Sequence, residues 1–389
     1  MCIDSLPTEI LARIAASLAS FGLYECCLVN KRFYTAFAPL LWRDIAVESE
    51  YMLDRLCRSL SNTSTSPGYQ VRQLHLDCYI EDDDCLSLMR HLPQLESLNA
   101  PHAGYLTDRS VIPLVQTCLQ LQEICLHSAS ITYRSLHYFS GLKRLRRLDL
   151  SGCSKISSLA LFPLQNCPLE LLNLSLCRWL TAEDTAVDLQ VFCMLKELSL
   201  ICCSTICKEF MCCLLPKTDS DQAPLPNLHA FSLTGDDEEI DDDVIVPFVQ
   251  SHPRLRSLIL MACAITDRSL LAMRDCLADL QNIEISYCSQ VSSNGVRQLI
   301  HGSPQLEMVG VKDCTVFKKD FPEIWTTDSL DQERSQYVDR LTFEEIELIR
   351  LQPCADEHIN MDEGELVTVE TPLDGEVTYI QTWLNLNGS

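Results

Sequence analysis

The sequence predicts an α/β solenoid of about ten repeats, with a short helical module before it and an acidic tail after it. The pattern Leu-x-x-Leu-x-Leu, in which other apolar residues replace some leucines, begins ten times between residues 71 and 306, at intervals of 24 to 33 residues. The first 45 residues do not follow this pattern. Repeats of about 20 to 50 residues are typical of solenoids, in which each unit buries its apolar face against its neighbours. With 389 residues, 47% of them hydrophobic, the chain can build such a core.

The N-terminal module is predicted to be helical. Its first helix places Ile10, Leu11, Ile14 and Leu18 on one stripe at helical spacing. A second apolar helix is expected around residues 28–33. A segment this short does not bury a core of its own without partners, so we expect its apolar stripe to bind another surface.

This module resembles an F-box, by which substrate receptors dock on the Skp-family adaptor of cullin-RING ubiquitin ligases. The matches are the opening Leu-Pro pair, the apolar positions of the first helix, the central Val-x-Lys/Arg segment and the closing tryptophan: Leu6, Pro7, Ile10, Leu11, Ile14, Val29, Lys31, Arg32 and Trp42. The sequence departs from the family at residues 20–22, where Asp-Pro is common, and at Phe33, where Trp is common.

The resemblance implies an F-box over residues 1–48. Its partners would be a Skp-family adaptor and a cullin-RING ligase core. The residues that it implies for adaptor binding are Leu6, Pro7, Ile10, Leu11, Ile14, Leu18, Leu28, Val29, Lys31 and Trp42.

A second interpretation of this segment is that it is only the N-terminal cap of the solenoid. Solenoids need a terminal unit with a polar outer face. The combination of the Leu-Pro opening, the basic pair after valine and the tryptophan favours docking, because a cap needs none of them.

Each repeat within residues 69–327 is predicted to form a short strand followed by a helix. The strand buries its apolar positions between neighbours, and the helix covers one side. Many repeats continue into a cysteine, as at Cys153 and Cys288, where a small side chain fits a tight corner. These features resemble the cysteine-containing subclass of leucine-rich repeats, and residues 106–111 and 265–270 match its helix start. The resemblance implies a horseshoe with parallel strands on the concave face.

Alternation along the strands predicts which side chains point to the open face of the sheet. Ile201, Ile259 and Met261 are expected there as exposed apolar residues, which often mark a binding patch, although single exposed apolar residues are also ordinary. A protein substrate is therefore expected on this face, at His127, Arg147, Asn173, Ile201, Ile259, Met261, Glu284 and Lys312.

The formal net charge of −24 is concentrated in two segments. Residues 328–389 hold 15 acidic and 3 basic residues, a net of −12, and residues 217–243 hold 9 acidic and 1 basic residue, a net of −8. The other 300 residues therefore carry only −4. Nucleic acid is not an expected partner, because its phosphates need positive charge.

Three further segments connect or end the repeats. Residues 49–68 are predicted to form a linker helix and a Ser/Thr-rich loop. The acidic insertion at 216–243 is predicted to form two loops, residues 217–226 before the strand at Leu228 and residues 236–243 after it. The acidic run is interpreted as solvated, as a clamp for a basic substrate segment, or as a calcium site, although it lacks the spacing of an EF-hand loop. In the tail, Thr342 and Glu345 predict a capping box for a helix to about residue 351. A predicted hairpin within residues 366–384 would cap the last strand edge or gate the concave face.

The sequence predicts no catalytic residues, no metal and no cofactor. The cysteines between residues 202 and 213 fit a repeat core better than a zinc site. His127 beside Cys125 lacks an orienting group for nucleophilic catalysis. The sequence contains no run of about 18 apolar residues, so no membrane span is predicted. The 22 cysteines are interpreted as reduced core residues of a cytoplasmic or nuclear protein.

Three functions remain open at this stage. The first is a substrate receptor of an SCF-type (Skp–cullin–F-box) ubiquitin ligase, which holds a protein for ubiquitination and proteasomal degradation. The second is a Ran-type GTPase-activating protein, which also joins repeats to an acidic tail. The third is an interaction scaffold with no link to ubiquitin.

Overall fold

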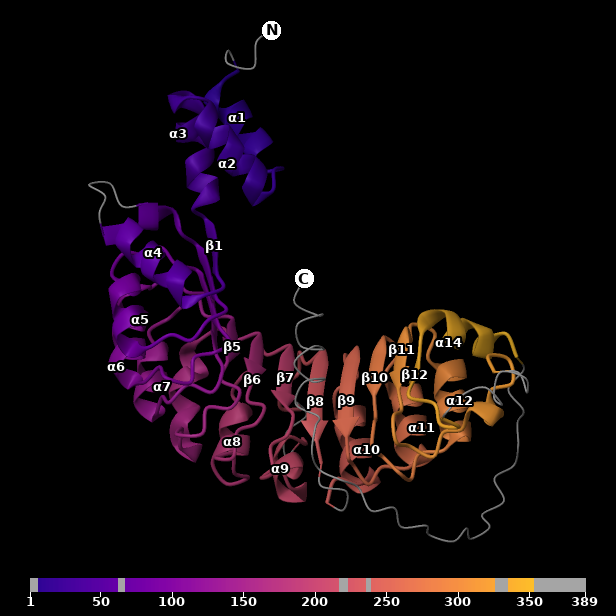
Figure 1. Cartoon of the computed structure of the whole chain (residues 1–389). Helices are drawn as coiled ribbons and strands as arrows, with labels where there is room; N and C mark the ends of the chain where they lie inside the picture. Colours follow the sequence, from indigo (N-terminus) through magenta and orange to yellow (C-terminus); the bar gives the residue numbers. More distant parts are fainter. Residues whose placement is uncertain (1–5, 62–66, 217–222, 236–238, 326–334, 353–389) are drawn as a thin grey trace. The chain divides into compact units, whose positions relative to one another are not determined.

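The structure is a computed structural model of the chain, and it describes residues 6–61, 67–216, 223–235, 239–325 and 335–352 (Figure 1). The chain divides into one unit at Met1–Pro353 and a second at Cys354–Ser389. All the described residues belong to the first unit, so the predicted hairpin lies outside them. No helix in the described residues is both long enough and apolar enough to cross a membrane.

The N-terminal module consists of three helices around a small core of their own. They are α1 (Thr8–Ala15), α2 (Ser20–Val29) and α3 (Lys31–Leu41). The core contains Leu11, Ala15, Leu23, Phe33, Ala36 and Phe37. The expectation of one helix across residues 28–33 is wrong. Asn30 is extended, with φ −166° and ψ 172°, and its side chain accepts a hydrogen bond of 2.9 Å from the Phe33 amide, so it ends α2 and caps α3.

The rest of the unit is built on one sheet, which has twelve strands among the described residues. Every neighbouring pair from β1 to β11 is parallel, and β12 is antiparallel to β11. The strands are β1 (Asp44–Val47), β2 (Gln73–Leu76), β3 (Ser97–Ala100), β4 (Glu123–Leu126), β5 (Arg147–Asp149), β6 (Leu171–Asn173), β7 (Glu197–Leu200), β8 (Ala230–Thr234), β9 (Ser257–Met261), β10 (Asn282–Glu284), β11 (Met308–Gly310) and β12 (Arg340–Leu341).

Ten of these strands, β2 to β11, are those that the leucine pattern predicts, so the predicted solenoid is confirmed. Between successive strands of the whole sheet, from β1 to β12, run helices and 3₁₀ turns, which follow one another along one side of the ladder and leave the other face of the strands open (Figure 1). These elements are α4 (Glu50–Ser61), η2 (Pro67–Gln70), α5 (Asp82–Met89), α6 (Asp108–Thr117), α7 (Tyr133–Phe139), η3 (Ser158–Ala160), η4 (Phe162–Asn166), α8 (Thr185–Leu189), α9 (Lys208–Cys213), α10 (Asp242–Ser251), α11 (Asp267–Cys276), α12 (Ser293–Gly302) and η5 (Lys318–Asp320).

Five corner cysteines each join their repeat to the one before it. Each thiol donates to the carbonyl of the last apolar strand residue of the preceding repeat, at sulfur–oxygen distances of 3.0–3.3 Å. The pairs are Cys153 with Leu126, Cys177 with Leu150, Cys203 with Leu174, Cys288 with Leu260, and Cys314 with Ile285. A small buried thiol therefore satisfies a backbone acceptor where a larger side chain would not fit.

Aspartates at the helix starts form a second connection between repeats. The Asp82 carboxylate accepts hydrogen bonds from the Thr107 amide and hydroxyl and from the Ser110 hydroxyl, at 2.9, 2.6 and 2.5 Å. The same arrangement recurs at Asp108, with Thr132 and Ser135, and at Asp242, with Thr266 and Ser269. Each threonine in turn caps its own helix.

This aspartate ladder corrects the interpretation of residues 236–243 as an acidic loop throughout. Its last three residues belong to the start of α10 and are committed to the fold. Asp241 caps α10 and pairs with Lys208 at 2.9 Å. Asp242 accepts a hydrogen bond from the Thr266 amide of the next repeat, and Asp243 pairs with Arg268 at 3.0 Å. Residues 217–222 and 236–238 of this insertion lie outside the described residues.

The C-terminal edge of the sheet is covered by β12 and α14 (Phe343–Arg350). The predicted helix is confirmed, and the Thr342 amide donates to Glu345 at 2.8 Å as the capping box requires. Ile346 and Ile349 are buried in the solenoid core. Residues 335–352 therefore protect the strand edge of β11.

Candidate docking surfaces

Rows of exposed apolar side chains run along two helices of the N-terminal module. Along α2, Phe21, Tyr24 and Leu28 follow one another at spacings of three and four residues, and they are 75%, 51% and 64% exposed. Along α1, Ile10 and Ile14 are 39% and 36% exposed. The opposite side of each helix packs into the module's core. These five residues, which we call the apolar stripes, form surface that the module itself does not cover.

The module's core and its ends fix the orientation of α1. Leu11 is fully buried between the helices, so it is not on the apolar stripes, which corrects its expected role in docking. The Pro7 carbonyl accepts from the Ile10 and Leu11 amides at 3.0 and 3.1 Å and thereby starts α1. The Arg32 guanidinium donates to the Leu6 carbonyl and ties that start to α3.

The other expected adaptor-binding residues lie in different places. Pro7, Val29 and Lys31 are exposed, while Leu6 and Leu18 pack partly against the module's core. Trp42 packs against the solenoid core, because α3 leads within two residues into β1, which pairs with β2. Trp42 is therefore a junction residue in this structure and not part of the apolar stripes.

The expected apolar patch on the open sheet face is not formed. Ile201 and Ile259 are only 3% and 4% exposed, and Met261 is half-buried. Ile259 lies in register between Ser232 of β8 and Glu284 of β10, so adjacent strands cover it from both sides. The interval of about 4.8 Å between strands leaves little room for water around such a side chain.

The middle of the open face carries a hydrogen-bonded polar network. Asn173, which is 5% exposed, donates to Asp149 at 2.8 Å and accepts from the Ser175 amide at 3.0 Å. The His127 Nδ1 lies 2.8 Å from the Ser151 hydroxyl. These groups satisfy one another across repeats, so they keep the face polar and rigid.

The charged residues expected on the open face have partners within the chain. Arg147 pairs with Glu123 at 3.6 Å, and Glu284 pairs with Arg340 of β12 at 3.8 Å. Lys312 donates to the Tyr287 hydroxyl at 2.8 Å. All three remain on the open face, but none of them is an unpartnered charge.

Residues 3–48 match the protein-family model described as F-box-like. The chain begins with an F-box-like module. Together with the leucine-patterned strands, this match shows a chain that joins an F-box-like module to a leucine-rich-repeat solenoid.

Several solved structures resemble the chain at low sequence identity. An internalin from Listeria monocytogenes str. 4b F2365 matches with a TM-score of 0.46 and 15% identity, over 91% of this chain and 95% of that one. The yeast Rad7–Elc1 complex matches with a TM-score of 0.41 and 14% identity, over 85% of this chain and 91% of that one. The TLR13–ssRNA13 complex matches with a TM-score of 0.37 and 16% identity, over 66% of this chain and 41% of that one.

Outside the F-box-like module, two groups of side chains bear on whether the chain has a reactive thiol or a metal site. Burial raises the pKa of the Cys125 thiol to about 12, so this thiol stays protonated at neutral pH and supplies no thiolate beside His127. Cys207, Glu209 and Glu239 bring their ligand atoms within 4.8 Å of one another, which sequence reasoning missed because Glu239 comes from the next repeat.

The exposure of Phe21 and Tyr24 in the F-box-like module was also not expected from the sequence. Residues 20–22 differ from the family's usual sequence, and this difference hid the apolar spacing that runs through them. Because α2 begins at Ser20, residues 21, 24 and 28 are spaced by three and four residues and lie on one face of that helix.

Proposed function

We propose that this protein is the substrate-recognition subunit of an SCF-type ubiquitin ligase. In this proposal the apolar stripes of the F-box-like module bind a Skp-family adaptor, and the solenoid binds a protein to be ubiquitinated and degraded. The observation that carries the proposal is that the module completes its own core and still exposes the apolar stripes on α1 and α2.

The energetics are compatible with a stable contact. Burying five such side chains contributes at most about 7–15 kcal/mol, at about 1.5–3 kcal/mol each. Association costs about 4–15 kcal/mol, and ordering of helices would add to this cost. The three helices already pack around Leu11, Phe33 and Phe37, so docking does not have to build them.

The protein would raise the rate of ubiquitin transfer by proximity. Holding the substrate beside the ubiquitin-charged enzyme makes the transfer effectively intramolecular, and no side chain of this chain has to react. The raised pKa of the Cys125 thiol, about 12, is consistent with such a non-catalytic role. In this proposal the protein acts in the cytoplasm or the nucleus, where the ligase core and its substrates are found.

The proposal is tested by co-purification of the full-length chain with a Skp-family adaptor. The variant Phe21→Ser with Leu28→Ser removes two large side chains from the stripe on α2 without touching the core. We expect it to lower adaptor binding at least 100-fold, because both side chains would lose apolar contact.

A matched control is Leu119→Ser, since Leu119 is 57% exposed on the solenoid, close to the 64% of Leu28. This control should bind the adaptor like the unchanged chain. Equal binding by the double variant and the control would exclude the apolar stripes as the docking surface.

A further inference from the structure

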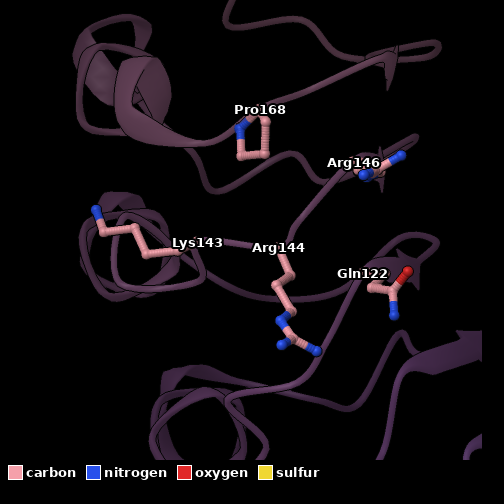
Figure 2. A pocket seen from close by; sticks show the side chains of 5 residues that line it. All are labelled: Gln122, Lys143, Arg144, Arg146 and Pro168. Carbon is pink, nitrogen blue, oxygen red and sulfur yellow. The ribbon is translucent and has the colours of Figure 1, made fainter.

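A pocket of about 240 Å³ lies at the segments that lead into the strands of three neighbouring repeats. It is lined by Gln122 before β4, by Lys143, Arg144 and Arg146 before β5, and by Pro168 before β6 (Figure 2). In the view of Figure 2, Arg144 lies between Lys143 and Arg146. The side chain of Lys143 extends to the left, and that of Arg146 extends to the right. The pocket is thus basic, although the chain carries a net charge of −24.

The backbone around the pocket is held in place by neighbouring repeats. Leu142 and Leu145, on either side of Lys143 and Arg144, are 1% and 0% exposed, so they anchor the turn and leave both basic side chains in solvent. The Arg146 amide donates to the Gln122 carbonyl at 2.8 Å. The Arg146 carbonyl accepts from the Glu170 amide at 2.7 Å. A ligand would therefore meet a backbone that is already ordered.

Only part of the pocket's positive charge is neutralised within the chain. Residues 143–147 include four basic side chains in five positions. Arg146 pairs with Glu170 at 3.2 Å, but Glu170 also pairs with Lys196 at 2.7 Å. Arg147 pairs with Glu123.

The other two basic side chains are not neutralised. Lys143 donates to the neutral carbonyl of Ser140 at 2.9 Å. Arg144 forms no ion pair with any residue of the described ranges. Two lining residues of the pocket, Lys143 and Arg144, thus carry positive charges that no carboxylate of the described residues pairs with.

We propose that this pocket binds an anionic side chain in a segment of a partner protein, either a carboxylate in an acidic stretch or a phosphorylated residue. Arg144 offers a planar fork of donors that matches the two oxygens of either group, and Lys143 adds a point charge. If the proposed function holds, that segment belongs to the protein that the ligase recognises. A long nucleic acid is a poor fit, because the remaining surface of so acidic a chain repels it.

The test measures peptide binding to the full-length chain by fluorescence anisotropy. Three labelled peptides of one length are compared: an Asp/Glu-rich peptide, a peptide with a single phosphoserine among neutral residues, and the same peptide with unmodified serine. We expect the first, the second or both to bind at least tenfold more tightly than the third, and binding to weaken as salt rises.

The variant Lys143→Ala with Arg144→Ala should lower that binding at least tenfold, while its melting temperature stays unchanged. Arg134→Ala is the matched control, since Arg134 is an exposed arginine of the same repeat with no ion pair in the described residues. It should bind like the unchanged chain. Any of three results would overturn the proposal. All three peptides bind equally, the double variant binds an anionic peptide as tightly as the unchanged chain, or single-stranded RNA binds more tightly than either anionic peptide.

Adaptor co-purification of the same variants separates this inference from the proposed function. Loss of peptide binding with the adaptor still bound is the expected result for Lys143→Ala with Arg144→Ala. If the unchanged chain binds an anionic peptide but no adaptor, the proposed function fails while the pocket stands.

Discussion

His252 follows α10 and is 3% exposed, with its ring stacked on Phe248 at 4.3 Å between centroids. Its Nε2 lies 2.8 Å from the Pro224 carbonyl and its Nδ1 lies 2.9 Å from the Phe248 carbonyl. Burial lowers the pKa of His252, although hydrogen bonds to these two carbonyls act in the opposite direction. Burial likewise lowers the pKa of His301. Both side chains link folding to protonation.

This linkage predicts a loss of stability on mild acidification. The unfolded chain binds a proton at His252 near pH 6.5, whereas the folded chain binds it only at lower pH, so the stabilising contribution is present above pH 6.5 and is lost below it. We expect the melting temperature to fall between pH 7.5 and pH 5, and to fall less in His252→Gln. An identical fall in both proteins would show that His252 does not contribute.

Within α14, the side chain of Arg350 adds polar contacts with the last repeat to the apolar packing of Ile346 and Ile349. The Arg350 guanidinium donates to the carbonyls of Ile300, Ser303 and Leu306 at 3.3, 2.5 and 3.1 Å, at and beyond the C-terminus of α12. It also pairs with Glu347 on its own helix. One cation thus satisfies backbone acceptors that the end of a helix leaves without partners.

Removing this contact should destabilise the C-terminal end of the solenoid. We expect Arg350→Ala to lower the free energy of unfolding in urea by about 2–4 kcal/mol, because charged hydrogen bonds contribute about 1.5–3 kcal/mol each and water replaces some of them. Leu351→Ala serves as the control, since Leu351 is 78% exposed. Its change should stay within about 0.5 kcal/mol. A similarly small change in Arg350→Ala would mean that α14 is held by Ile346 and Ile349 alone.

The elements that the sequence predicts well are those with strong local patterns. All ten strands from β2 to β11 carry the leucine pattern in full, and the capping box before α14 is visible in four consecutive residues. The strands that were missed are β1 and β12. Residues 44–47 have too short an apolar alternation to stand out, and β12 has only two residues, which pair antiparallel with β11.

Features that depend on several repeats at once were predicted poorly. The burial of Ile259 depends on strands about 25 residues away on either side, and the basic pocket draws its walls from three repeats. Asp242 was assigned to an acidic loop because its partner, Thr266, lies in the following repeat. In a solenoid such contacts form between units, so one unit's sequence does not reveal them.

At the scale of the whole molecule, the chain separates two kinds of surface. The F-box-like module exposes apolar side chains, whereas the solenoid's open face is polar, with its charges paired across repeats. Apolar stripes suit a stable partner, and a polar face suits selective recognition of a substrate that must later leave. This division of surfaces is what the proposed receptor role needs.

The most direct test of the account is hydrogen–deuterium exchange of the full-length chain, with and without a Skp-family adaptor. If the apolar stripes form the docking surface, adaptor binding slows exchange in α1 and α2, residues 8–29, and leaves exchange in the strands from β2 to β11 unchanged. Protection confined to the solenoid, or no protection anywhere at saturating adaptor, would contradict the claim that the apolar stripes form the docking surface.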